Sequence, residues 1–233
     1  MVKHDRKGLA ESAALQQHRL GLAYLGTRDD GYRGIWCMNQ PSNDEYVYKY
    51  SGGLGTYCAK HRPFAVYAPA VNKTFFCYGG STRDNNTQLI HMVSYYDHET
   101  GTVPRPFALL DKETEDAHDN PVISLDARGH VWIFSTSHGT GRPSYIHRSA
   151  APYSIDSFEL IPATRIVEGG TRELITNFSY MQPWYIPGRG FICFFTRYGY
   201  PAARTTCCMT SPDGVAWSEW TRLGAIHQGH YQV

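Results

Sequence analysis

Short apolar runs separated by turn residues follow one another along most of the chain, and three of these runs recur at a regular spacing. They begin at Thr74, Val131 and Phe191, which are 57 and 60 residues apart, and each follows a turn that contains glycine or asparagine. A shorter apolar run at or after a proline precedes each turn, at 63–66, 121–124 and 183–186. Because β-branched and aromatic residues dominate these runs, the pattern predicts three β-hairpins.

Two more strands are predicted after each hairpin. They lie at 89–95 and 107–110, at 144–148 and 158–161, and at 204–210 and 217–220. Four short strands in a repeating unit of about sixty residues are typical of a β-propeller blade. Beyond residue 25 no stretch shows a sustained helical period, so the predicted fold class is all-β, a β-propeller of four-stranded blades.

The turn at Ser211-Pro-Asp213-Gly214-Val-Ala-Trp217 resembles the Asp-box, or BNR, turn of sialidase-type propellers. In that turn a small polar residue and an aspartate hydrogen-bond a tight loop, and an aromatic side chain plugs the blade. This copy has one residue fewer between Asp and Trp than the commonest form. The alternative is an ordinary Asp-Gly hairpin turn, and either interpretation concerns fold and not activity.

Three predicted blades run from about residue 58 to residue 225, and His230–Val233 resembles the start of another. Closed propellers use about four to eight blades. We therefore expect residues 27–233 to be an incomplete propeller domain of three to four blades, about the N-terminal half of a longer protein. Residues 1–26 are expected to form an N-terminal extension that is poorly ordered or a short helix.

Composition excludes several classes of partner. Lys and Arg total 22 against 21 for Asp and Glu, a net charge of +1 without basic or acidic runs, so we expect no nucleic-acid partner. No apolar stretch approaches the roughly 18 residues of a membrane span, so we expect no membrane contact. The charged residues 3–7 are not followed by an apolar core, so no signal peptide is visible.

Candidate chemistry gathers at the two ends of the second hairpin. His118 lies just before its first strand and His138 lies just after its second. A hairpin brings these two ends to one edge, so we expect the two imidazoles to be close in space. Imidazole changes its charge near neutral pH, so such a pair suits proton transfer or anion binding.

The third hairpin carries two further candidates at equivalent places. Tyr180 follows His118 by 62 residues, and Arg197 follows His138 by 59 residues. If neighbouring blades lie side by side, all four residues share one rim near the central channel. The alternatives are structural: the histidines cap strands or lie on the surface, Tyr180 packs between blades, and Arg197 pairs with Asp119.

The four side chains together suit β-elimination from a uronic acid. Arg197, helped by His138, would neutralise the carboxylate and so acidify the C5 proton beside it. Either His118 or Tyr180 would remove that proton, and the other would protonate the leaving O4.

Five segments resemble the BNR repeat-containing family of seven-bladed propellers, which includes the ulvan lyases. They are GYRGIW at 31–36, NDEYVYKY at 43–50, SGGLGT at 51–56, AHDNP at 117–121 and FSTSHG at 134–139. The similarity covers roughly residues 27–233 of this chain, but only the N-terminal half of such a protein.

The resemblance implies a function as well as a fold. Ulvan lyases cleave a sulfated algal polysaccharide at uronic acid by β-elimination, and His118, His138, Tyr180 and Arg197 fall at their catalytic positions. It implies a polysaccharide substrate, no organic cofactor, and further substrate-binding residues in the missing C-terminal half. We expect the protein to be secreted or periplasmic, because polymers of this size are cut outside the cytoplasm.

Three less specific residues are candidates for substrate binding. Asn120 is placed to hydrogen-bond a sugar hydroxyl, although Asn-Pro often just starts a strand. Trp184 and Tyr198 are candidates for stacking on a sugar ring, with core packing as the alternative.

The sequence offers only a partial metal site. Cys58 and His61, with Cys77 beyond them, are candidate zinc ligands, but no second close pair completes a set of four. A structural zinc or calcium ion is therefore an open expectation. The alternative for Cys77 is a buried thiol inside a hydrophobic run.

Two other functions remain open at the level of sequence. A sialidase-like glycoside hydrolase would need a carboxylate or an activated tyrosine as nucleophile. A carbohydrate-binding propeller would need no chemistry at all.

Overall fold

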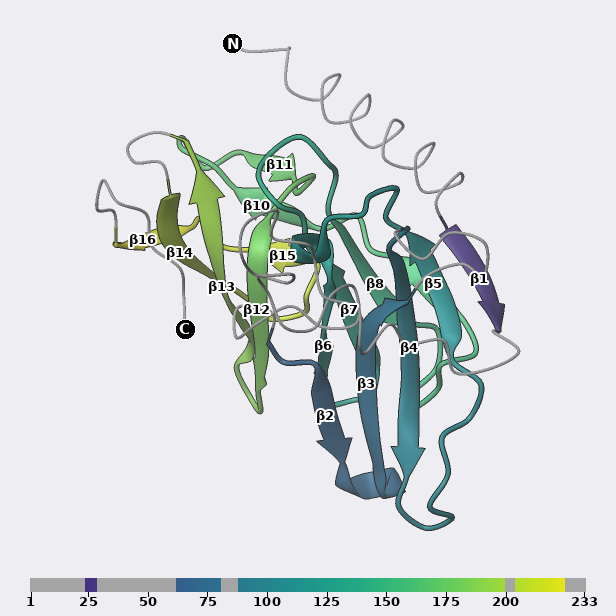
Figure 1. Cartoon of the computed structure of the whole chain (residues 1–233). Coiled ribbons are helices and arrows are strands. Elements are labelled where there is room, and N and C mark those ends of the chain that lie inside the picture. The colour runs from purple at the N-terminus through teal and green to yellow at the C-terminus, as the bar shows by residue number, and fades with distance from the viewer. Residues whose placement is uncertain (1–23, 29–61, 81–87, 200–203, 225–233) are drawn as a thin grey trace.

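The computed structural model describes residues 24–28, 62–80, 88–199 and 204–224, and this part of the chain is built almost entirely of antiparallel β-sheet (Figure 1). Its helical structure is limited to two 3-10 turns, η1 (Pro69–Val71) and η2 (Ala117–Asp119). No helix within these ranges has the length and hydropathy to cross a membrane. The all-β prediction is confirmed.

Three sheets follow one another along the chain. The first has the order β1-β5-β4-β3-β2, from β1 (Tyr24–Arg28), β2 (Ala65–Ala68), β3 (Lys73–Gly80), β4 (Ile90–Asp97) and β5 (Phe107–Asp111). The second runs in chain order through β6 (Pro121–Leu125), β7 (Val131–Ser135), β8 (Tyr145–Ser149) and β9 (Phe158–Leu160). The third contains β12 (Ser179–Ile186), β13 (Gly190–Tyr198), β14 (Arg204–Ser211) and β16 (Thr221–Gly224).

A small fourth sheet differs from the predicted pattern. It joins β10 (Thr164–Ile166) to β11 (Arg172–Leu174) and, in parallel, to β15 (Ala216–Trp217). The prediction of a fourth blade strand at 217–220 is therefore wrong, because Trp217 belongs to β15 and β16 at 221–224 pairs with β14. The indole of Trp217 is completely buried. This burial keeps its short strand paired with β10, and not with β14 at the edge of the third sheet.

The predicted N-terminal extension also needs a correction at its end. Residues 24–26 belong to β1, which adds a fifth strand to the first sheet by pairing with β5. The rest of the extension, and the segments at 31–56 that carry part of the family resemblance, lie outside the described residues.

The middle sheet is buried on both faces, and β7 shows this most clearly. Val131 and Ile133 pack in one hydrophobic core with side chains of the first sheet such as Phe75. Trp132 and Phe134 pack in a second core with side chains of the third sheet. Successive residues of a strand point to opposite faces, so an uninterrupted apolar run is what a strand between two sheets requires. The three sheets therefore stack face to face, as blades do.

The turn at 211–217 is closed by hydrogen bonds to Asp213 and from Trp217. Asp213 Oδ1 accepts from the backbone N–H groups of Val215 and Ala216 at 2.9 and 2.8 Å. The indole N–H of Trp217 donates to the Gly214 carbonyl at 2.9 Å. Gly214 has φ +79°, and a Cβ there would lie 2.6 Å from the Trp132 ring. This position therefore needs glycine for both its backbone angle and its space.

We expect Gly214→Ala to lower the free energy of unfolding by about 2–4 kcal/mol, from backbone strain plus the clash with Trp132. Gly188→Ala is the matched control, because Gly188 has φ +77° but a Cβ added there would meet no atom within 4 Å. The control is expected to lose only about 1–2 kcal/mol. Urea denaturation measures both, and equal losses would show that the contact with Trp132 is unimportant.

His147 is a completely buried histidine at the centre of β8. Neither ring nitrogen has a hydrogen-bond partner in the part of the chain that the structure describes, and the ring stacks on Tyr24 at 6.1 Å. Burial, and then the charge of Lys112, lower the pKa of His147 to about 3. The folded protein therefore keeps this imidazole neutral.

This burial predicts a loss of stability in acid. As pH falls below the ordinary histidine pKa of about 6.5, the unfolded chain binds a proton that the folded chain takes up only near pH 3. Over that window we expect His147 to remove up to about 1.4 kcal/mol of unfolding free energy per pH unit. His147→Phe should flatten this part of the pH dependence in denaturant melts. Parallel pH curves for the variant and the wild type would contradict the assignment.

Candidate functional site

His118 and His138 meet at one edge of the second sheet, as the hairpin predicts. His118 lies in η2 before β6, and His138 lies in the loop after β7. Their rings stack with centroids 4.3 Å apart and planes 22° apart. Both side chains are partly exposed, so the pair can meet a ligand.

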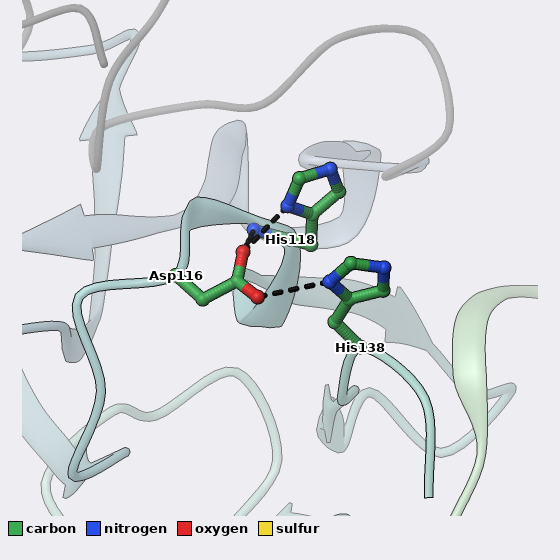
Figure 2. Close-up of side chains that lie close together, drawn as sticks. All are labelled: Asp116, His118 and His138. Atoms are coloured by element: carbon green, nitrogen blue, oxygen red, sulfur yellow. Dashed lines mark hydrogen bonds and ion pairs between the residues drawn. The ribbon is translucent and has the colours of Figure 1, made fainter. Parts of the chain in front are cut away.

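One carboxylate holds both rings (Figure 2). Asp116 Oδ1 lies 2.5 Å from Nδ1 of His118, and its Oδ2 lies 2.9 Å from Nδ1 of His138. Burial alone would raise the pKa of Asp116, but the hydrogen bonds from His118 and His138 outweigh it and hold that pKa well below its usual range. Asp116 is therefore an anion, and each ring turns its other nitrogen away from it (Figure 2).

A second aspartate and an arginine support this carboxylate. Asp119 is completely buried and accepts the backbone N–H of His138 at 2.5 Å. Arg142 donates from Nε to Asp119 at 2.6 Å and from Nη2 to Asp116 at 3.1 Å. Two anions and one cation thus tie η2 to the 138–142 loop.

Groups from the neighbouring sheets fix the same loop. Lys112, which is buried and directly follows β5, donates to Ser137 Oγ at 2.8 Å and to the Pro143 carbonyl at 2.5 Å. Asn177 donates to the Gly139 and Arg142 carbonyls at 3.1 and 2.8 Å. Burial lowers the pKa of Lys112 to about 8. The loop therefore holds its shape through side chains that the first and third sheets supply.

His91 of β4 contacts η2. Its ring is completely buried and lies 2.9 Å from Ser135 Oγ and 2.8 Å from the Asp119 carbonyl. These contacts link the first sheet to β7 of the second sheet and to η2, which carries His118.

Tyr180 reaches the histidine pair because β12 is irregular there. The register of β12 against β13 shifts between Ser179 and Gln182, and Tyr180 has φ +52°. A bulge with a left-handed non-glycine residue turns a side chain away from its regular direction. The buried ring lies 6.0 Å from the rings of both His118 and His138, which places it where the sequence predicted.

Tyr198 also joins the cluster, whereas Arg197 faces elsewhere. The Tyr198 ring lies 5.8 Å from His138, and its hydroxyl lies 3.4 Å from that of Tyr180. The next residue along a strand points to the opposite face, and the Arg197 guanidinium lies 3.7 Å from the centre of the Trp220 ring. The alternative partner considered for Arg197 is also wrong, since Asp119 pairs with Arg142.

Arg197 lines a cleft of about 250 Å³ beside the histidine pair. Tyr198 and Thr140 also line this cleft and connect it to the pair. Burial, and then the charge of Arg165, lower the pKa of Arg197. The predicted rim is thus divided, with His118, His138 and Tyr180 in one cluster and Arg197 in the adjoining cleft.

The remaining candidates lie apart from the cluster. Asn120 is 1 % exposed and forms part of the interior. Trp184 is 44 % exposed, but four residues of strand separate it from Tyr180, about 13 Å. Cys77 lies in a hydrophobic core, where burial raises the pKa of its thiol, as its structural alternative predicts. Cys58 and His61 lie outside the described residues.

The cluster has the composition of a metal site but the contacts of a hydrogen-bonded network. Asp116, His118 and His138 offer ligand atoms within 4.8 Å of one another, and these residue types bind zinc. The Arg142 guanidinium already places a positive charge 3.1 Å from Asp116. A second cation would be repelled there, so we interpret the group as an acid–base cluster.

Asp116 and Arg142 were not among the sequence-based candidates. Asp116 stands two residues before His118, a spacing at which a carboxylate reaches a neighbouring backbone N–H and ring. Arg142 is a single charge in the Gly139-Thr-Gly loop that follows His138. The sequence positions of Asp116 and Arg142 do not by themselves predict which residues these side chains contact.

Comparisons with known proteins agree with this fold. The model of the BNR repeat-containing family matches residues 73–232. The chain belongs to this family. No curated protein sequence matches the chain.

Two solved structures of an ulvan lyase, which is a polysaccharide lyase, share the fold of this BNR-family chain. Each has a TM-score of 0.59 and 17 % identity, and each match covers 74 % of this chain and 40 % of the lyase. The second is bound to GlcA(1-4)Rha3S. An N-acetylgalactosamine deacetylase from F. plautii, with a TM-score of 0.38 and 14 % identity over 77 % of this chain and 58 % of its own, is too dissimilar to carry an argument.

We expect Asp119→Asn to destabilise the protein by about 2–3 kcal/mol, because Arg142 loses its buried counter-charge. The loss stays below that of a fully buried pair, since a third of Arg142 is exposed. Asp156→Asn is the control, because it breaks an exposed pair with Arg28 and should change stability by at most about 1 kcal/mol. Thermal melts compare the two, and similar small losses would mean that the Asp119–Arg142 pair adds nothing.

Proposed function

We propose that this protein is a polysaccharide lyase that cleaves a uronic-acid polymer of the ulvan class by β-elimination. The observation that carries the proposal is the pair of stacked imidazoles held by Asp116, with Tyr180 against both rings. Membership of the BNR repeat-containing family and the fold shared with an ulvan lyase support it. The partly exposed cluster offers proton acceptors and donors side by side, which elimination requires.

The reaction assigns a role to each of the predicted residues. His118 or Tyr180 removes the C5 proton, the C5–H electrons form the C4=C5 double bond, and the C4–O4 bond breaks as the other residue protonates O4. The carboxylate on C5 would lie against His138, and Arg197, whose guanidinium packs on Trp220 in the adjoining cleft, would have to turn toward it on binding. Positive charge at that carboxylate stabilises the enolate-like transition state.

The carboxylates of the cluster favour this reaction over hydrolysis. A glycoside hydrolase of the usual kind uses two carboxyl groups, one as acid and one as base or nucleophile. Asp116 already accepts hydrogen bonds from two rings, and Asp119 accepts from Arg142 and the His138 backbone. Neither has the freedom that a nucleophile needs, whereas His118 and His138 supply imidazoles, which can give and take protons near neutral pH.

The chain spans 40 % of the length of the ulvan lyase that it resembles. We propose that its three sheets are blades of a seven-bladed propeller, and that the C-terminal half supplies further contacts to the polysaccharide. The chemistry requires no organic cofactor. A substrate of this size implies a secreted or periplasmic protein.

The test measures unsaturated uronate by its ultraviolet absorbance, using protein expressed from the whole open reading frame. We expect product from ulvan or a related uronic-acid polymer, and we expect His118→Ala to lower the rate by about 10²–10⁴-fold. His98→Ala is the control, because His98 is an exposed residue that directly follows β4, and its rate should equal that of the wild type.

Other outcomes would overturn the proposal. Release of reducing sugar without a double bond would show a hydrolase. Polymer binding without either product would show a binding propeller. Full activity of His118→Ala would remove the histidine pair from the reaction.

A further inference from the structure

Lys112 places an ammonium group between the two ends of the loop that carries His138. Its Nζ donates to Ser137 Oγ and to the Pro143 carbonyl, and these residues directly precede and follow the 138–142 loop. Ser137 Oγ in turn donates to the Pro143 carbonyl at 2.9 Å. One lysine beside the first sheet therefore closes this loop at its base.

The charge of Lys112 strengthens this closure. The residue is only 5 % exposed, and its Nζ lies 5.5 Å from the centre of the Tyr145 ring. Hydrogen bonds from a charged donor are about twice as strong as those from a neutral donor, and an aromatic ring attracts a cation but not a neutral amine. The ammonium form therefore holds the base of the loop more tightly than the neutral amine would.

The loop that is closed in this way supplies two members of the histidine cluster. Nδ1 of His138 lies 2.9 Å from Asp116 (Figure 2), and Arg142 donates to the same carboxylate at 3.1 Å. Both contacts require the loop to keep its path. Because His138 directly follows Ser137, a shift of Ser137 moves the backbone of His138 with it.

We propose that Lys112 is a positioning residue, which in its ammonium form fixes the base of the 138–142 loop and so sets the orientation of His138. Its effect on rate rests on the proposed elimination, but the orientation of His138 can be measured without any reaction. The inference also predicts an upper limit to the working pH, because a neutral Lys112 would hold the loop less firmly.

The charged and titratable groups around Lys112 come from three neighbouring segments. Burial, which has the largest effect, and the positive charge of Arg142 in the loop lower the pKa of Lys112 to about 8, whereas Asp119 of η2 acts in the opposite direction. His147 of β8 also feels the ammonium, but its own pKa is lowered to about 3, so it carries no charge in alkali. Lys112 therefore loses its charge near pH 8.

Global stability and positioning respond to this deprotonation in opposite directions. The folded chain releases the Lys112 proton near pH 8, and the unfolded chain releases it near pH 10.5. Between these values the unfolded chain binds more protons, so the contribution of Lys112 to the free energy of unfolding rises with pH. A fall in rate over the same range, without a fall in this contribution, therefore reports on the loop and not on unfolding.

The first experiment follows the His138 ring by NMR in the protein without substrate. Between neutral pH and about pH 10 we expect its resonances to show a titration near pH 8. The step should disappear in Lys112→Met and move above this range in Lys112→Arg, which stays charged. Lys73→Met is the matched control, because Lys73 is a partly buried lysine at the other end of the first sheet, and it should keep the step.

The second experiment measures the formation of unsaturated product by the same variants. We expect Lys112→Met to lower kcat by about 10–100-fold with little change in KM, because misplacement of His138 disturbs the reacting groups more than binding. Lys112→Arg should recover most of this loss and should retain its rate above pH 8, where the wild type slows. Urea denaturation at each pH provides the stability with which the rates are compared.

The outcomes separate this inference from the proposed function. If the wild type forms no unsaturated product, the elimination is wrong, but the NMR titration still tests the role of Lys112. A His138 titration that is the same in Lys112→Arg as in the wild type would overturn the inference, even if Lys112→Met does not fold. Equal losses of rate above pH 8 in the wild type and in Lys112→Arg would also overturn it.

Discussion

The burial of the middle sheet on both faces is the constraint on which the rest of this structure depends. Alternate residues of β7 enter two different hydrophobic cores, one shared with the first sheet and one with the third. Neither face of this sheet can move without opening a core, so its strands are fixed in register and in direction. The ends of β6 and β7 therefore stand at a defined edge, and η2 and the 138–142 loop extend from that edge.

The polar groups at this edge are organised by the same constraint. Loops usually lie on the surface and vary in shape, but here polar side chains in or next to the first and third sheets hold η2 and the loop that follows β7. Lys112 and His91 come from the first sheet, and Asn177 precedes β12 of the third. Each of these side chains forms a hydrogen bond with a group beside the histidines. The packing of the sheets therefore fixes the positions of the two rings.

Asp116 and Asp119 fix different parts of the cluster. Asp119 is completely buried and holds backbone and Arg142, so it determines where the loop lies. Asp116 is partly exposed and holds the two rings, so it determines how the imidazoles are oriented. Because these roles are separate, the two imidazoles stay partly exposed while the groups that support them are buried, which is the arrangement expected of a preorganised site.

The sequence by itself determined the all-β class, the three hairpins and the meeting of His118 with His138. These features depend on period-two patterns and on the closure of a single hairpin, which are local. Tertiary structure alone decided the rest. The bulge that turns Tyr180 inward, the turn of Arg197 toward Trp220, and the convergence of Asp116 and Arg142 depend on contacts between sheets. A one-residue change of register reverses the face of a side chain, so sequence spacing alone does not predict them.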